Sequence, residues 1–190
     1  MNGQPTIPLL SLTPPIPAEE DVTKVAAWIP TYTSEGDVVR TYFADGTTRD
    51  LHCRIRTVID HVAAHHGASP DLIRRQYTQM RRLYMPLALG GTVLVPFRVR
   101  PPKIVRDATL GYVNLRHIRD CYPSTGDAPS RLVLSCADIP VYWQHTTTVR
   151  HIEAAVMYLP QTATDPLYPM ALRLAQLLHM MIEVKQQPVP

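Results

Sequence analysis

Patterns typical of strands and patterns typical of helices occupy separate blocks of this 190-residue chain, and this grouping constrains the fold more than any other feature. The first block is strand-like over 25–32 and over 38–43, where β-branched and aromatic residues predominate. An Asp-Gly turn at 45–46 then predicts a hairpin whose return strand runs over 47–51. Together these segments predict a small antiparallel meander.

Helical periodicity follows the meander. Between Cys53 and Gly67 the apolar residues recur at a spacing of three and four, which predicts an amphipathic helix. Its expected inward stripe is Ile55, Val58, Ile59, Val62 and Ala63. Ser69 can cap a second helix with Pro70 at its first position, and Pro86 ends that helix.

A second block of strands precedes a second pair of helices. The expected strands are 92–97, 111–118, 131–136 and 139–143, and the expected helices are 148–159 and 165–185. Strands grouped apart from helices favour an α+β fold with a mainly antiparallel sheet and about four helices. We expect a proline-rich flexible arm over 1–18 and a single domain over 19–190, with no apparent internal repeat.

Composition and targeting signals indicate a cytoplasmic protein. The three cysteines, Cys53, Cys121 and Cys136, are odd in number and not closely spaced, which argues against a disulfide framework. The first 17 residues lack the charged start of a signal peptide. No window approaches about 18 consecutive apolar residues, so no membrane span is expected.

Positive charge is concentrated in the middle of the chain. Between Arg74 and Arg119 there are ten Lys and Arg residues and one acidic residue, Asp107, a net charge of +9. The whole chain carries +3, so the remaining nine basic and fifteen acidic residues sum to −6. This asymmetry favours a polyanionic partner, and double-stranded DNA is our first choice. The alternative is a solvated surface whose charges pair with the acidic remainder of the fold.

A loop within this segment is the best candidate for the contact. Arg98 and Arg100 have strand spacing and would project to one face, and Lys103 follows two prolines that stiffen the loop. A rigid basic loop can enter a DNA groove at little entropic cost. The expected nucleic-acid-binding residues are Arg74, Arg75, Arg81, Arg82, Arg98, Arg100, Lys103, Arg106 and Arg116.

Candidate catalytic and metal sites are weaker. His61 and His65 lie one helical turn apart, as zinc ligands can, but the glutamate of the metalloprotease motif is absent. Cysteines at 121 and 136 could pair with histidines at 117 and 145, yet nothing nearby marks an oxyanion hole. We expect no enzyme activity, no bound metal and no cofactor.

Two runs resemble a known family. Val93-Leu94-Val95-Pro96, the basic loop, and Gly111-Tyr112-Val113-Asn114 with Ile118 resemble ComK, the competence transcription factor of Gram-positive bacteria. The strands over 132–134 and 139–141 continue the likeness, which covers about residues 86–145. It implies a multimeric, DNA-binding transcriptional activator of AT-rich sites. The run from Val113 to Ile118 also resembles LytTR-type domains, which bind DNA through loops of a β-fold.

Two other classes of function stay open. The expected helix over 165–185 is apolar around more than one stripe, which suits a homo-oligomer or a protein-interaction (adaptor) module. A small enzyme acting on an anionic metabolite is the third class. DNA binding needs the arginines on one face, whereas an enzyme needs them to converge in a pocket.

Overall fold

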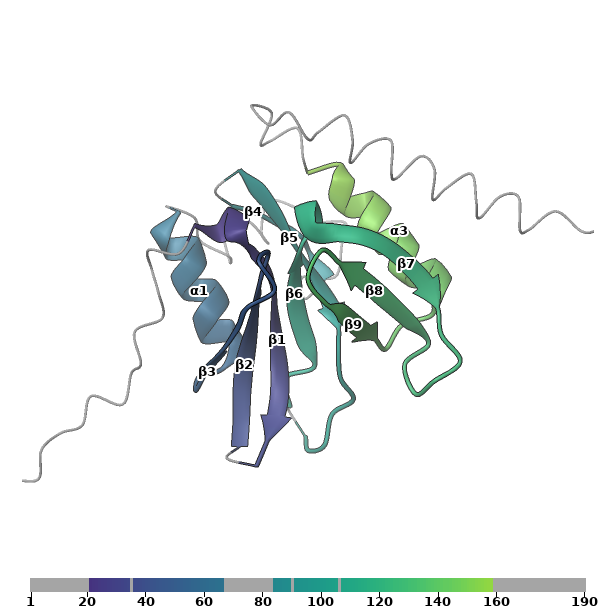
Figure 1. Cartoon of the computed structure of the whole chain (residues 1–190), viewed down its shortest axis with the longest axis horizontal. Coiled ribbons are helices and arrows are strands. Elements are labelled where there is room, and N and C mark those ends of the chain that lie inside the picture. The colour runs from purple at the N-terminus through teal and green to yellow at the C-terminus, as the bar shows by residue number, and fades with distance from the viewer. Residues whose placement is uncertain (1–20, 35, 67–83, 90, 106, 159–190) are drawn as a thin grey trace, which may run out of the picture.

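The computed structural model describes residues 21–34, 36–66, 84–89, 91–105 and 107–158 (Figure 1). Its two α-helices are α1 (Ile55–His65) and α3 (His145–Val156), and two short 3₁₀ helices are η1 (Val22–Lys24) and η3 (Leu115–His117). The strands are β1 (Val25–Thr33), β2 (Gly36–Phe43), β3 (Thr48–Leu51), β4 (Leu87–Leu89), β5 (Thr92–Arg98), β6 (Leu110–Asn114), β7 (Ile118–Pro123), β8 (Ser130–Leu134) and β9 (Asp138–Val141).

All strand pairs of the described part are antiparallel, so the expected α+β class with a mainly antiparallel sheet is confirmed. One sheet has the order β3-β2-β1-β6-β5-β4, and the other has the order β7-β8-β9. The described residues contain two α-helices instead of the four expected. Of the other two expected helices, residues 70–83 and 165–185 lie outside the described residues, as does the arm over 1–18.

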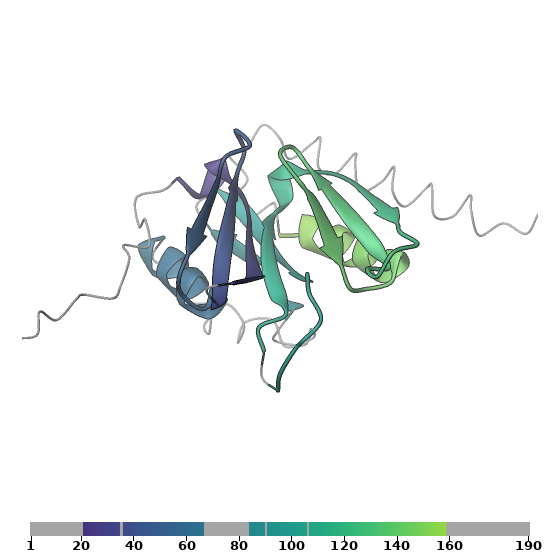
Figure 2. The same ribbon diagram turned by 60° about the horizontal axis from the view of Figure 1, so that its bottom comes forward.

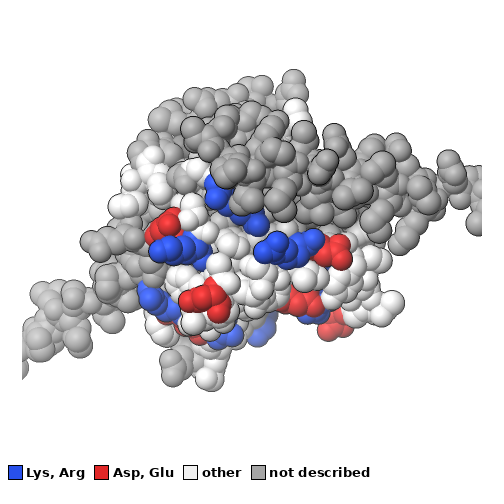
Figure 3. Space-filling model, turned by 45° about the horizontal axis from the view of Figure 1, so that its top comes forward, with Lys and Arg blue, Asp and Glu red and all other residues white. Residues whose placement is uncertain are grey.

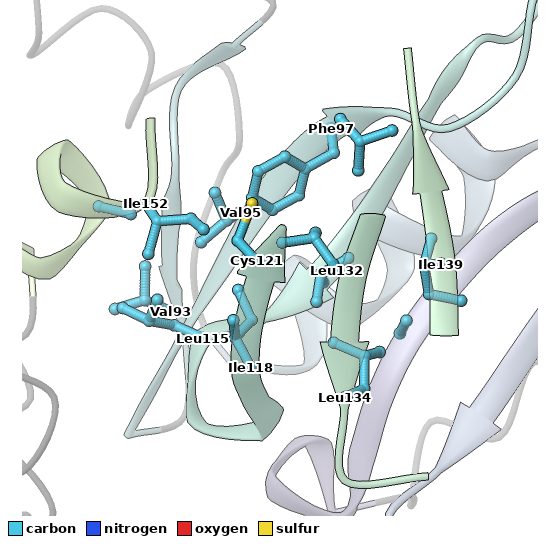
Figure 4. Close-up of a cluster of buried hydrophobic side chains, with 14 of the residues drawn as sticks. Val93, Val95, Phe97, Leu115, Ile118, Cys121, Leu132, Leu134, Ile139 and Ile152 are labelled. Atoms are coloured by element: carbon cyan, nitrogen blue, oxygen red, sulfur yellow. The ribbon is translucent and has the colours of Figure 1, made fainter. Parts of the chain in front are cut away.

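The six-stranded sheet is buried on both faces at β5, which explains why this strand is apolar from Val93 to Phe97. Leu94 faces a core formed with α1, and its neighbours Val93 and Val95 face a second core formed with α3 and the smaller sheet. Figure 4 shows this second core, where side chains from β5, β7, β8, β9 and α3 point toward one another. Alternation of side chains along a strand thus supplies both cores.

The two helices bury the stripes expected of them. Ile55, Val58, Ile59 and Ala63 of α1 are buried, and Val62 packs against the same core. In α3, the described residues that were expected to point inward are buried as well. They are Val149, Ile152, Ala155 and Val156. The helix begins at His145, three residues earlier than the sequence suggested. None of the helices among the described residues is long and apolar enough to cross a membrane.

The structure contains an internal repeat that the sequence did not reveal. Residues 21–65 and 114–156 each form a 3₁₀ turn, three antiparallel strands and an α-helix, in that order. Figure 2 shows these two units side by side, each a fan of three strands with its helix below. In both units three residues separate the third strand from the helix. The sequence shows no apparent repeat, so the likeness of the two units lies in the order of their elements.

Strand register makes the equivalence of the two units specific. β1 and β7 each have an irregularity after their first residue, between Val25 and Ala27 in one and between Ile118 and Asp120 in the other. Beyond it the pairs correspond one to one. Trp28↔Thr41, Ile29↔Arg40 and Pro30↔Val39 in the first unit match Cys121↔Leu132, Tyr122↔Arg131 and Pro123↔Ser130 in the second.

The start of each unit is capped in the same way. The side chain of Asp21 accepts a hydrogen bond from the amide of Thr23, and the side chain of Asn114 accepts one from the amide of Arg116. This cap ends β6 at Asn114 and opens η3, so the single strand expected over 111–118 was wrong. Local bonds from Asp and Asn to nearby amides compete with strand pairing in this way.

Asn114 also joins the two units. Its side-chain nitrogen donates to the carbonyls of Val22 (3.2 Å) and Val25 (3.0 Å), and its oxygen also accepts from the hydroxyl of Thr92. The residue is fully buried. A buried amide with all its polar atoms paired fixes the second unit against the first.

Candidate nucleic-acid interface

The loop over 99–109 connects β5 to β6 and extends beyond the ends of these two strands, next to the β1–β2 turn (Figures 1 and 2). Its two ends are held together, because the amide of Val99 donates to the carbonyl of Thr109 (2.9 Å) and Val99 is buried. The loop therefore leaves the sheet from a closed base.

Arg100 is buried beneath the loop. Its Nε donates to the carbonyl of Ala108 (2.6 Å), and its two terminal nitrogens lie 3.0 and 3.1 Å from the carboxylate of Asp37. Nη2 also lies 2.8 Å from Oδ1 of Asp107. The guanidinium is thus bonded on all its nitrogens, and its residue is 6% exposed.

Asp107 connects the far end of the loop to the same cluster. Its side chain is 2% exposed, and its Oδ2 accepts hydrogen bonds from the hydroxyl of Tyr32 and the amide of Lys103. The guanidinium carbon of Arg100 and the ammonium of Lys103 each lie over the Tyr32 ring, 3.8 Å from its centroid. The Tyr32 ring therefore contacts both cations.

This cluster changes how the charge of the loop is interpreted. Two cations, Arg100 and Lys103, balance two carboxylates, Asp37 and Asp107. Arg100 therefore supports the loop from beneath. The sequence suggested that its guanidinium would face solvent, but the residue is buried. Lys103 lies on the exposed side.

The outer part of the loop carries two exposed aliphatic side chains. Ile104 is 73% exposed and Val105 is 90% exposed. The amide of Asp107 donates to the carbonyl of Ile104 (3.3 Å), which draws the tip back toward the buried cluster. Two adjacent apolar side chains are thus held in contact with solvent in a loop that also carries charged residues.

The other described arginines of the predicted interface lie elsewhere. Arg98 is half-buried at the end of β5, where its carbonyl accepts a hydrogen bond from the amide of Tyr142 (2.7 Å). Arg116 donates from Nη2 to the carbonyl of Gly91 (2.7 Å), at the opposite end of β5. Seven residues of strand separate the two ends by roughly 20 Å. Arg116 and the loop tip therefore do not form one compact site.

Five of the nine predicted contact residues, Arg74, Arg75, Arg81, Arg82 and Arg106, lie outside the described residues. On the face shown in Figure 3, the Lys and Arg side chains of the described part form separate groups with Asp and Glu beside or between them. That face offers no continuous basic strip within the part that is described. The loop over 99–109 carries two of the four described candidates, Arg100 and Lys103, and we take it as the candidate interface.

The cysteine and histidine candidates do not form a catalytic pair. Burial, with a smaller contribution from the charge of Asp120, raises the pKa of the Cys121 thiol to about 12. Burial also raises the pKa of Cys136. Nε2 of His145 bonds to the carbonyl of Cys121 (3.1 Å), and Nε2 of His117 bonds to that of Thr23 (2.8 Å). Protonated thiols and main-chain-bound imidazoles provide no activated nucleophile.

No metal site is formed within the described residues. No group of three His, Cys, Asp or Glu side chains there could hold a metal ion. His61 and His65 both lie on α1, and the His65 ring contacts His66 edge to face, with centroids 5.4 Å apart.

Sequence reasoning missed the residues that anchor the loop. Tyr32 and Asp37 flank the β1–β2 turn, 75 and 63 residues away from their partners Asp107 and Arg100. No local pattern signals such a distant pairing. The exposed pair Ile104 and Val105 was also missed, although two adjacent β-branched apolar residues between charged neighbours in an expected loop were a signal for it.

Comparisons of the chain with protein-family models, with curated proteins and with solved structures found no match. The ComK-like resemblance of residues 86–145 thus stays an expectation. Any functional conclusion depends on the geometry of the loop itself.

Proposed function

We propose that this protein is a DNA-binding regulator that contacts duplex DNA through the loop over 99–109. One observation carries the proposal: a buried ion cluster holds the loop in place, and the loop carries the exposed residue Lys103, whose ammonium lies over the Tyr32 ring. A preorganised loop loses little conformational entropy on binding, so more of the contact energy contributes to affinity. The concentration of Lys and Arg between Arg74 and Arg119 supplies long-range attraction to phosphates.

The activity that the proposal assigns is transcriptional regulation, in keeping with the resemblance to ComK, and it involves no cofactor. We place the protein in the cytoplasm and expect it to act as a homo-oligomer. The helix that would mediate assembly, over 165–185, lies outside the described residues.

A fluorescence anisotropy titration with duplex DNA tests the proposal. We expect binding at about 50 mM salt and a steep loss of affinity at about 200 mM, because each phosphate contact releases counterions. Lys103→Ala should lower the slope of log affinity against log salt by about 1. Lys24→Ala is the matched control, since Lys24 is exposed but lies on η1. No binding at low salt, or equal slopes for both variants, would contradict the proposal.

Arg100 is unsuitable for this test. Removing it would leave Asp107, whose side chain is 2% exposed, without its ionic partner. Breaking a buried ion pair on one side costs about 3–5 kcal/mol, so a loss of binding by Arg100→Ala would report on folding.

The second candidate is a protein-interaction module. Its support is the exposure of Ile104 and Val105, which could enter an apolar pocket of a partner. A protein that fails to bind DNA under the conditions above would favour this reading.

A further inference from the structure

The tip formed by Ile104 and Val105 is the most exposed apolar feature of the loop. Large aliphatic side chains scattered singly on a surface need no explanation. These two are adjacent and exposed by 73% and 90%, and they lie at the end of a loop whose base is buried. Water contact at this position is unfavourable for both side chains unless a partner covers them.

The loop also holds this tip in place. The carboxylate of Asp107 bonds to Arg100, Tyr32 and the amide of Lys103, so the chain is fixed immediately before Ile104 and shortly after Val105. Pro101 and Pro102 restrict the approach to the tip further. Two aliphatic groups on a fixed support are suited to insertion into a narrow space.

The cation beside the tip favours an anionic partner. Lys103 precedes Ile104 directly and is exposed, and its ammonium lies over the Tyr32 ring, 3.8 Å from the centroid. Stacked base pairs flanked by phosphates provide the matching arrangement, an apolar interior with negative charge on both sides. Proteins that bind duplexes use one or two aliphatic wedges to unstack a base step, at a cost of a few kcal/mol.

A membrane surface is a weaker match, because the apolar surface of the tip is too small to give stable membrane binding. The side chains of Ile104 and Val105 together hold about half as many carbons as a myristoyl chain, which alone gives only marginal membrane binding. Insertion between bases needs no more apolar surface than this pair provides.

We propose that Ile104 and Val105 form a wedge that inserts between adjacent base pairs of bound duplex DNA and unstacks them. The inference rests on the proposed DNA-binding function and adds its mode of contact. Lys103 binds a neighbouring phosphate, and the ion cluster of Arg100, Asp37 and Asp107 keeps the wedge in position.

The test uses the full chain and duplexes that contain 2-aminopurine at successive TA steps, since such steps unstack most easily. The fluorescence of this base rises when it is unstacked. We expect a rise of several-fold at one or more positions with the wild type. The double variant Ile104→Ser with Val105→Ser should abolish the rise while weakening the affinity by about tenfold or less, because the phosphate contact is retained.

The control is Met157→Ser, which removes an apolar side chain that is 74% exposed but lies at the end of α3. It should leave both the fluorescence rise and the affinity unchanged. Circular dichroism of each variant verifies the fold.

Each remaining outcome overturns a different statement. Salt-dependent binding without a fluorescence rise, or an equal rise with the serine variant, refutes the wedge and leaves DNA binding standing. No DNA binding by the wild type refutes the proposed function. Binding to phosphatidylcholine–phosphatidylserine vesicles that the serine variant loses, without any signal from DNA, assigns the tip to membranes.

Discussion

The two units of the repeat share a backbone and differ in what surrounds it. In the first unit, β1 lies inside the six-stranded sheet, with β2 on one side and β6 on the other. In the second, β7 is at the edge of its sheet and pairs only with β8 among the described strands. The same order of elements therefore serves as an interior unit and as an edge unit.

The difference extends to single polar groups. Asp21 and Asn114 cap equivalent 3₁₀ turns, yet Asp21 is exposed while Asn114 is fully buried and bonds to both units. The equivalent helix positions 61 and 151 are both histidine, counting from the starts of α1 and α3. Nε2 of His151 bonds to the carbonyl of Pro96 (2.9 Å), whereas the buried Nε2 of His61 has no partner among the described residues. The repeated backbone places two residues at equivalent positions, and the elements packed around each one determine the bonds that it makes.

The largest effect on the free energy of unfolding is expected at Asn114, the cap of η3. Asn114→Ala should lower the free energy of unfolding by about 4 kcal/mol, because it leaves several buried donors and acceptors unpaired. Asp21→Ala removes an exposed cap and should cost about 1 kcal/mol. Urea denaturation of both variants measures the two values. Equal losses would mean that Asn114 does not join the units.

The next largest effect is a loss of stability at low pH, which we expect from His151 of α3. The equivalent residue of α1 is His61. Burial lowers the pKa of His151 to about 4, and the hydrogen bond to Pro96 opposes this shift only in part. Because the unfolded pKa is about 6.5, the unfolded chain binds the proton more readily below that value. Stability is therefore full above about pH 6.5 and falls by up to about 3 kcal/mol as the pH drops toward 4.

His151→Phe should remove this part of the pH dependence, since phenylalanine does not titrate. His61→Phe is the matched control at the equivalent helix position and should leave the contribution of His151 in place. Urea midpoints between pH 4 and pH 7 provide the measurement. An unchanged pH profile in His151→Phe would show that the loss of stability comes from other groups.

The sequence predicted what local patterns determine. The apolar stripe of α1 and the Asp-Gly turn that joins β2 to β3 are properties of neighbouring residues, and Gly46 has the positive φ of 88° that such a turn requires. The sequence does not display the repeat, because the two units share their strand register but differ in the side chains at equivalent positions. Between equivalent positions, Val39 is replaced by Ser130 and Trp28 by Cys121.

The candidate site was predicted only in part. The loop was found from its charge and its prolines, and Lys103 lies on its exposed side. Arg100 was assigned to the surface because strand alternation continues through it in the sequence. The chain leaves β5 at Arg98, and carboxylates distant in the sequence draw Arg100 inward. Contacts between segments far apart in the sequence decide such cases, and a single sequence does not display them.

The smallest expected effect concerns the exposed edge of the second unit. At Cys121, the position equivalent to Trp28, the amide donates to Oδ1 of Asp120 (2.7 Å) and the carbonyl bonds to Nε2 of His145 (3.1 Å). In the first unit, Trp28 lies beside Tyr112 of β6 instead. In the interior unit a neighbouring strand covers this position, and in the edge unit the side chains of Asp120 and His145 bond to the backbone groups instead. Edge strands can avoid pairing with other chains in this way.

Asp120→Ala combined with His145→Ala should therefore uncover this edge. We expect a loss of about 1 kcal/mol for each hydrogen bond and self-association that grows with protein concentration, measured by sedimentation velocity. Arg119→Ala, an exposed neighbour on β7, is the control and should match the wild type. If the double variant sediments as the wild type does and keeps its stability, the two side chains do not protect the edge. The contrast between an interior unit and an edge unit would then reflect strand order alone.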